Sequence, residues 1–373
     1  MKFLSNKKVL LISTEKWGVN FVSKHHYACE LINNGNIVYF LNPPDKTIKD
    51  FIIEKLFNYD KLYLIKYPLK FRGLNKLPKF INDYITKPEI NKILKTMRYI
   101  DLVWSFDPFR YQNMNLFNAK KKIYYCADPH LTNKESIIAK SADLVLTPSN
   151  LLADQFKGLN DNVFNIGHGV SNVFFEDINE INGIVMPGRN KLKVGCVGNL
   201  NNTNISKIVL HEIIITNSNL DFIFIGPTGD SNLSLQNNGS DKKYFEKLMI
   251  LDNVYFLGAK HYTELPSYYK HFDVFLTCYD EVSNPLILSN NHKTMEFLST
   301  GKAIVSHFMD EFKSHRNLLN MPDENKSLSY VFNDTIKNLD YYNNEELEYE
   351  RIKYAKNNTY DNKLSYIDDL LYV

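Results

Sequence analysis

The chain has 373 residues, of which 44% are hydrophobic and 23% charged, a composition typical of a globular protein with about two domains. The formal net charge is only +2, so no overall excess of basic residues favours nucleic acid as a partner. No stretch approaches the ~18–20 consecutive apolar residues of a membrane-spanning helix, and the N-terminus lacks the pattern of a secretory signal peptide.

In the first half of the chain, short apolar runs alternate with helical stretches such as 25–33 and 134–140. This alternation indicates a parallel sheet covered by helices on both faces. Strands are expected at 8–13, 36–42, 61–67, 102–106, 122–127, 144–149 and 163–167. The pattern stops at 174–191, where mixed charge, Pro187 and two glycines indicate a linker.

The alternation then restarts, which predicts a second domain. Strands are expected at 193–199, 221–227, 253–258, 273–278 and 303–307, with a helix at 264–270. We therefore expect an α/β protein with two Rossmann-like domains facing across a cleft, with the ligand beyond the carboxyl ends of the strands. The expected divisions are a first domain at 1–175, a linker at 176–191, a second domain at 192–340, and a C-terminal helix at 341–373 that could cross back to the first domain.

Segment 291–306 is the most informative. Lys293 and Glu296 lie three residues apart, so they share one face of a helix, and Gly301 is placed to end that helix. The segment resembles family 4 of the GT-B glycosyltransferases, in which a lysine precedes Glu-Tyr/Phe-Leu-Ala and Gly-Lys-Pro-Val-Val. The resemblance implies that Glu296 accepts hydrogen bonds from the ribose of a nucleotide sugar and that Lys293 neutralises its diphosphate. The alternative is a surface ion pair worth tenths of a kcal/mol.

Three further stretches of the second half resemble the donor-binding domain of the same enzymes in the same order. They are 194–204, 222–227 and 253–276. The resemblance implies that Gly198 and Asn199 approach the diphosphate, and that the loop containing Gly258, His261 and Tyr262 contacts the base. A glycine loop before a helix suits an anion because its backbone N–H groups can point at the phosphates.

One position departs from the family pattern. Many family members carry a second glutamate eight residues before the ribose-binding one, and here that position is Leu288. The preceding loop offers Asp280, Glu281, Ser283, Asn284 and Asn291 instead, and Asn284-Pro285 is the counterpart of an Asn-Pro found in related polysaccharide enzymes. The alternative for this loop is ordinary turn chemistry.

In the first half, the stretch 13–44 resembles the first strand, loop and helix of the same enzymes. Gly18 would let the chain pass close to phosphate or acceptor, and His25 and His26 open the helix, where imidazole can donate or accept a proton. His168, in the approach to the hinge, would face the cleft in that picture. The alternative for the histidines at the helix start is packing against neighbours.

Acidic residues end two strands of the first half. Asp128, followed by His130, lies at the carboxyl tip of one strand, and Asp107 lies at the tip of another. Asp128 or Asp107 could orient an acceptor hydroxyl or act as a general base. The alternative is a helix N-cap or an Asp-Pro turn.

The segment 51–95 is locally basic, with aromatic and aliphatic residues interleaved among its lysines. Such a patch suits an anionic membrane surface carrying a lipid-linked acceptor, although a solvated lysine-rich face is the alternative. Four scattered cysteines, Cys29, Cys126, Cys196 and Cys278, have no metal-ligand spacing and predict buried, reduced thiols. We therefore expect a cytoplasmic protein, and the membrane interpretation of segment 51–95 would add peripheral association with the inner face of the plasma membrane.

These features together predict a glycosyltransferase that moves a sugar from a UDP- or GDP-linked donor to a glycan or lipid-linked acceptor in capsule, lipopolysaccharide or related surface polysaccharide synthesis. The resemblance suggests retention of configuration and no metal cofactor. A UDP-sugar 2-epimerase of the same fold is one alternative. A two-lobed ligand-binding protein is a more distant one, and the missing signal peptide argues against it.

Overall fold

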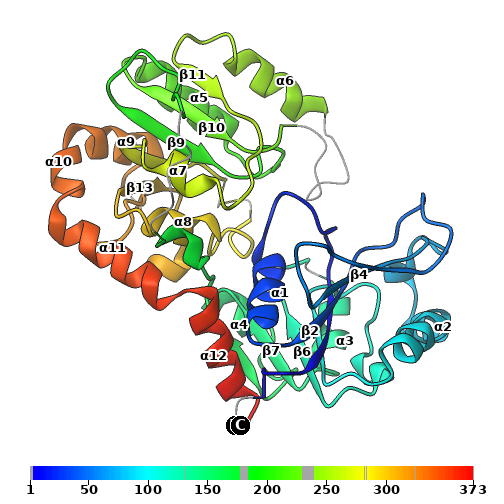
Figure 1. Ribbon diagram of the computed structural model, residues 1–373. Coiled ribbons are helices and arrows are strands. Elements are labelled where there is room, and N and C mark those ends of the chain that lie inside the picture. Colours follow the sequence, from blue (N-terminus) through cyan, green and yellow to red (C-terminus); the bar gives the residue numbers. More distant parts are fainter. Residues whose placement is uncertain are drawn as a thin grey trace. The chain divides into compact units, whose positions relative to one another are not determined.

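The computed structural model describes residues 3–130, 132–176, 184–228, 239–280, 282, 284–323 and 325–372, and the side chains of 75 and 239–242 are outside the description. The chain forms two compact units, each built on its own sheet (Figure 1). The first unit comprises Met1–Trp17, Val22–Gly167 and Tyr360–Val373, and the second comprises Gly18–Phe21 and His168–Thr359.

The first unit contains an eight-stranded sheet in the order β3-β4-β2-β1-β5-β6-β7-β8. Its strands are β1 (Lys8–Ile12), β2 (Ile37–Leu41), β3 (Ile52–Lys55), β4 (Leu62–Lys66), β5 (Leu102–Ser105), β6 (Lys121–Tyr125), β7 (Leu144–Thr147) and β8 (Val163–Asn165). Only β3 runs antiparallel to its neighbour. Val9 and Leu11 point into one apolar cluster and Leu10 and Ile12 into another, so β1 is buried on both faces.

Helices cover both faces of this sheet. They are α1 (Ser23–Asn33), α2 (Lys79–Met97), α3 (Asn133–Ala139), α4 (Asn150–Asp154) and α12 (Tyr360–Leu370), with 3₁₀ turns at Leu74–Lys76 and Met114–Phe117. The last helix, α12, packs on α1, where the ring of Tyr360 stacks on His26 with centroids 4.6 Å apart. A carboxylate oxygen of Asp368 accepts a hydrogen bond from the backbone of Leu4. The final segment of the chain therefore completes the core of the first unit.

The second unit contains a five-stranded, fully parallel sheet in the order β11-β10-β9-β12-β13. Its strands are β9 (Lys193–Val197), β10 (Asp221–Ile225), β11 (Val254–Phe256), β12 (Val274–Thr277) and β13 (Ala303–Ser306). Its helices are α5 (Lys207–Thr216), α6 (Gly239–Leu248), α7 (Leu265–Tyr269), α8 (Lys293–Leu298), α9 (Leu328–Lys337), α10 (Leu339–Tyr342) and α11 (Glu345–Asn357), with 3₁₀ turns at Asn172–Phe174 and Asp310–Phe312. Separate apolar clusters pack against its two faces.

The fold class expected from the sequence, α/β with two Rossmann-like sheets, is confirmed. The sequence pattern does not anticipate every element, and β3 and α2 are two examples. β3 is a four-residue edge strand, and α2 carries Pro88 inside it and exposes Phe80 and Tyr84. The tail 341–373 is not one helix but the end of α10 followed by α11 and α12, and only α12 belongs to the first unit. Within the described residues, no helix is long and apolar enough to span a membrane.

Candidate functional site

Three glycines end consecutive strands at the carboxyl edge of the second sheet. Gly198, Gly226 and Gly258 follow β9, β10 and β11, and the amide of Gly226 donates to the carbonyl of Gly258 at 3.0 Å. Gly226 has φ +153°, and a Cβ built on it would lie 1.8 Å from the carbonyl oxygen of Gly198. The loops after β9 and β10 can therefore approach this closely only without a side chain at Gly226. This edge exposes backbone where parallel α/β folds bind ligands.

A buried carboxylate lies on α8. Lys293 Nζ donates to both carboxylate oxygens of Glu296, at 2.7 and 2.8 Å, and the hydroxyl of Tyr269 donates to Oε2 at 2.8 Å. Only 4% of Glu296 is exposed, so the pair is not the solvated surface pair that was the alternative. Burial raises the pKa of Tyr269 well above its usual value, with a further increase from the nearby Glu296 charge.

This carboxylate retains limited capacity for a ligand. A carboxylate offers about four acceptor positions, and three are occupied by Lys293 and Tyr269. A ligand that brings two hydroxyl groups must therefore displace Lys293 from at least one oxygen. An anionic group on the same ligand would give the released ammonium a new partner. Tyr269 was missed in the sequence because it lies 27 residues from Glu296 and belongs to no local motif.

The end of α8 is held by a buried arginine on α11. Arg351 donates to the carbonyls of Gly301, Leu318 and Tyr342 at 2.9, 3.2 and 2.7 Å. Gly301 has φ +76°, and a Cβ there would lie 2.3 Å from Cγ of Glu348. α11 therefore fixes the helix that carries Glu296. Burial lowers the pKa of Arg351 to about 10, so the guanidinium is charged at neutral pH.

The two remaining strands of this sheet, β12 and β13, are each followed by an aromatic side chain at the same edge. Tyr279 follows β12 and His307 follows β13, with ring centroids 5.1 Å apart. Burial raises the pKa of Tyr279 to about 12, against hydrogen bonds with Asn291 and Asn202 that lower it. Burial lowers the pKa of His307 to about 4, so both rings are uncharged at neutral pH. Neither residue was among the candidates from the sequence.

The asparagines proposed for donor binding shape the loops around this edge. Asn284 Nδ2 donates to Asn204 Oδ1 at 2.9 Å, which ties the loop after β12 to the loop after β9. Asn199 Oδ1 accepts from the backbone of Asn201 at 3.1 Å. Leu288 is buried at 4% exposure, so it adds no polar group in place of the missing glutamate. Glu281 and Ser283 lie outside the described residues.

The remaining candidates of the second unit are two histidines, Tyr262 and Gly18. The backbone of His261 donates to Glu264 at 2.9 Å, and burial lowers the pKa of its ring although Glu264 opposes the shift. Tyr262 stacks on Phe21 with centroids 4.6 Å apart, and Phe21 belongs with Gly18 to the short segment assigned to this unit. His168 is buried, with its ring centroid 6.1 Å from that of His292.

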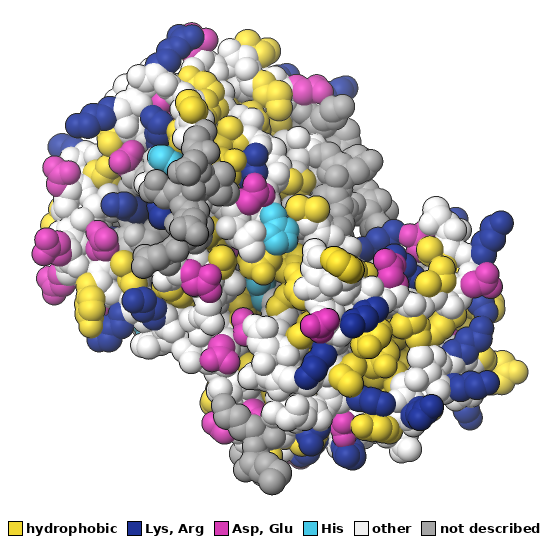
Figure 2. Space-filling model, in the orientation of Figure 1, with side chains coloured by type: hydrophobic (Ala, Val, Ile, Leu, Met, Phe, Trp, Pro, Cys, Tyr) yellow, Lys and Arg dark blue, Asp and Glu magenta, His cyan; other side chains and the backbone are white. Residues whose placement is uncertain are grey.

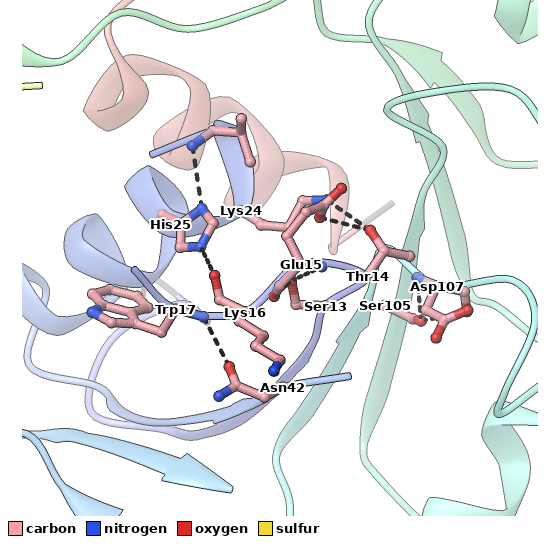
Figure 3. Close-up of polar contacts among 11 residues, drawn as sticks. Ser13, Thr14, Glu15, Lys16, Trp17, Lys24, His25, Asn42, Ser105 and Asp107 are labelled. Carbon is pink, nitrogen blue, oxygen red and sulfur yellow. Dashed lines mark hydrogen bonds and ion pairs between the residues drawn. The ribbon is translucent and has the colours of Figure 1, made fainter. Parts of the chain in front are cut away.

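In the first unit, the loop between β1 and α1 holds a polar network (Figure 3). Lys24 forms an ion pair with Glu15, and the hydroxyl of Thr14 donates to the same carboxylate at 2.7 Å. Desolvation by burial would raise the pKa of Glu15, but Lys24, Thr14 and His25 together outweigh it, so the pKa is lowered. Glu15 and Lys24 were not singled out in the sequence, where no motif marks them.

The two candidate histidines of the first unit, His25 and His26, lie in the first turn of α1 and are buried. His25 Nδ1 accepts from the backbone of Val22 at 3.2 Å, and Nε2 lies 3.2 Å from the carbonyl of Lys16, which requires the proton on Nε2. Burial and Lys24 lower the pKa of His25 to about 4, against the two backbone contacts. His26 is buried against Tyr360. Packing, the alternative stated for these histidines, is the arrangement observed.

The acidic candidates lie in different environments. Asp107 is buried and accepts from the backbone amides of Phe109 and Arg110 at 2.7 and 3.4 Å, which is the Asp-Pro turn expected as its alternative. Asp128, after β6, is exposed, and desolvation by the surrounding protein raises its pKa although Lys24 lowers it. His130 is also exposed, with its ring 4.7 Å from that of Phe109. Of the three, Asp128 is the accessible carboxylate.

The neutral, buried histidines predict acid sensitivity. A histidine with a folded pKa near 4 and an unfolded pKa near 6.5 contributes stability that is complete above pH 6.5 and is lost as the pH falls toward 4. We expect each of His25 and His307 to remove about 2 kcal/mol from the free energy of unfolding between pH 7.5 and 5. Urea unfolding of wild type and His307→Gln at both pH values measures this. An equal loss in the two proteins would contradict the assignment for His307.

The described residues contain no group of three or more His, Cys, Asp or Glu side chains arranged to hold a metal ion. The four cysteines are free, and Cys126, Cys196 and Cys278 are buried.

Comparison with known proteins identifies the fold. No protein-family model and no curated protein sequence matches the chain. Solved structures match over nearly its whole length. Sucrose-phosphate synthase from Thermosynechococcus elongatus has 11% sequence identity and a TM-score of 0.70, with 98% of each chain covered. The Anabaena HepE protein in complex with UDP and glucose has 14% identity and a TM-score of 0.66, covering 98% of this chain and 99% of its own.

A third neighbour, trehalose-6-phosphate from Escherichia coli bound with UDP-2-fluoro glucose, has 11% identity and a TM-score of 0.68, with 98% of this chain and 99% of its own chain covered. At 11–14% identity these matches show that the chain has the GT-B fold. They do not distinguish family 4 from the other enzymes of that fold.

Proposed function

We propose that this protein is a glycosyltransferase that binds a nucleotide sugar in its second unit. The observation that carries the proposal is the buried Glu296 carboxylate of α8, held by Lys293 and Tyr269, in the unit whose sheet has Gly198, Gly226 and Gly258 at its carboxyl edge. A fixed carboxylate suits the paired hydroxyls of a ribose, and a displaceable ammonium suits the neighbouring diphosphate. Among the structural neighbours, HepE is in complex with UDP and glucose.

The finer features of the reaction are also proposals. Because the resemblance in sequence is to retaining enzymes, we propose retention, with leaving-group phosphate assisting removal of the acceptor proton. If the reaction inverts, Asp128 is the accessible carboxylate of the first unit and its raised pKa suits a general base. We further propose a lipid-linked acceptor of surface polysaccharide synthesis. Lys293 and backbone amides would neutralise the donor without a metal, so EDTA should leave the rate unchanged.

Thermal unfolding with and without UDP, GDP, dTDP or CMP tests the donor site. One nucleotide at 100 times its Kd is expected to stabilise the protein by about 2.7 kcal/mol, since it binds the folded state alone. Failure of all four to raise the melting temperature would refute the donor site. If a bound UDP sugar is converted in the absence of any acceptor, the protein is an epimerase rather than a transferase.

A further inference from the structure

A cavity of about 230 Å³ lies within the first unit. Its wall is formed by the segment before β3, the segment after β4, α2, and the turn after β5. Tyr67 and Pro68 follow β4 directly, and Arg110 follows β5, so the cavity lies at the carboxyl edge of these parallel strands. Ligands of α/β folds bind at this edge. None of the groups assigned above to the donor site lines this cavity.

The guanidinium group of Arg110 forms one wall of the cavity, and its neighbours hold it in place. Arg110 is 8% exposed, lies 4.7 Å above the ring of Tyr67, and donates to both oxygens of Glu89 at 3.1 and 2.8 Å. Within the described part of the chain, its Nε has no hydrogen-bond partner. The turn that carries Arg110 is fixed by the buried carboxylate of Asp107, which explains why an acidic residue follows β5. The site therefore contains a buried donor that no described group satisfies.

The rest of the lining combines positive charge with apolar surface. Three exposed lysines, Lys49, Lys70 and Lys92, line the cavity, and none has an ion pair among the described residues. The acidic side chains of the lining are Asp50, which is exposed, and Glu89, which Arg110 and Tyr111 already bind. The apolar part comes from Phe51, Tyr67, Phe71, Leu74 and Ile85.

The surface of the same unit continues this combination. Figure 2 shows hydrophobic side chains of the first unit flanked by Lys and Arg side chains. Phe71 is 52% exposed at the cavity, and Phe80 and Tyr84 of α2 are 73% and 81% exposed. A small anion alone would need no apolar lining, and an uncharged lipid would need no lysines. The two features together select a molecule that carries both groups.

We propose that this cavity binds an anionic amphiphile, a phosphate or diphosphate joined to an apolar chain. The phosphate lies among Arg110, Lys70 and Lys92, and the chain passes over Phe71 toward the exposed aromatic side chains. The volume is below the roughly 300–1,000 Å³ of pockets that enclose a drug-sized ligand, so the cavity holds the head group and the chain remains partly outside. The identification of this ligand as the acceptor rests on the proposed function, whereas its binding does not.

Calorimetric titration of the full chain with farnesyl phosphate, farnesol and inorganic phosphate tests the proposal. Farnesyl phosphate is expected to bind at least tenfold more tightly than either of the others. Equal affinity for inorganic phosphate would show a site for free anions, and equal affinity for farnesol would show a merely apolar groove. Either result, or no binding of farnesyl phosphate, overturns the proposal.

Two matched double variants locate the site. Lys70→Glu with Lys92→Glu is expected to weaken farnesyl phosphate binding at least tenfold. Lys76→Glu with Lys87→Glu makes the same change of charge at exposed lysines of the same segment that do not line the cavity. This control is expected to change the affinity for farnesyl phosphate less than twofold. Equal weakening would indicate long-range attraction rather than a site. Phe71→Ser should weaken the binding of farnesyl phosphate but not the binding of inorganic phosphate. The thermal shift with nucleotide is expected to be unchanged in all three proteins, and it tests the donor site separately.

Discussion

Glu296→Gln is expected to lower the affinity for the donor nucleotide about 100-fold. Glutamine has the shape of glutamate but offers one neutral acceptor oxygen, whereas the carboxylate offers two charged ones. A hydrogen bond to a charged group contributes about 1.5–3 kcal/mol, so the change should cost roughly 3 kcal/mol of binding free energy. The nucleotide that raises the melting temperature of the wild type should therefore have almost no effect on the variant at the same concentration.

The substitution also acts on the protein without ligand, since it leaves Lys293 beside an uncharged amide. Unfolding of both proteins without nucleotide separates this loss of stability from the loss of binding. Glu346→Gln, at an exposed position on α11 in the same unit, is the matched control and should retain the full thermal shift. A nucleotide that stabilises wild type and Glu296→Gln equally would show that the carboxylate does not contact the donor.

Gly226→Ala is expected to destabilise the second unit by about 3 kcal/mol. The new Cβ would lie 1.8 Å from the carbonyl oxygen of Gly198, so the backbone of one loop must move. The residue must also keep φ near +153°, a conformation that an L side chain rarely adopts. For a unit of this size, the melting temperature should fall by roughly 6–12 °C. Because the displaced loop carries Gly198, nucleotide binding should weaken as well.

Gly258→Ala separates the two causes of this effect. Gly258 lies at the same sheet edge with φ +70°, but nothing lies within 4 Å of a Cβ built there. Gly258→Ala therefore introduces backbone strain of about 1–2 kcal/mol without the steric clash that Gly226→Ala causes. Differential scanning calorimetry should show a clearly larger loss for Gly226→Ala than for Gly258→Ala. Equal losses would mean that the close approach of the two loops adds nothing to stability.

The strands of both sheets could be predicted because a parallel strand buried on both faces is a continuous apolar run. β10 has all five residues buried, and its sequence shows this directly. β3 could not be predicted in this way, since it is an edge strand with Glu54 and Lys55 exposed. α2 could not be predicted from the sequence because its 19 residues have no strong apolar face and include Pro88. Its place in the fold follows from tertiary packing.

Some residues of the candidate donor site could likewise be predicted from the sequence, and others could not. Lys293 and Glu296 could be paired from the sequence because three residues of helix bring their side chains together. Tyr269 and Arg351 act on α8 from 27 and 50 residues away, through contacts that exist only in the folded chain. The turn role of Asp107 was an open alternative, and only the positions of the amides of Phe109 and Arg110 decide it.

The position of α12 has a consequence for synthesis. Tyr360, Leu364, Ile367 and Leu371 belong to the same apolar cluster as Leu4 and Val9, at the opposite end of the sequence. All of the second unit is translated before these residues emerge. Domains commonly fold in the order of their synthesis, first domain first. Here the unit begun first is finished last, so the apolar cluster of the first unit stays incomplete until α12 has left the ribosome.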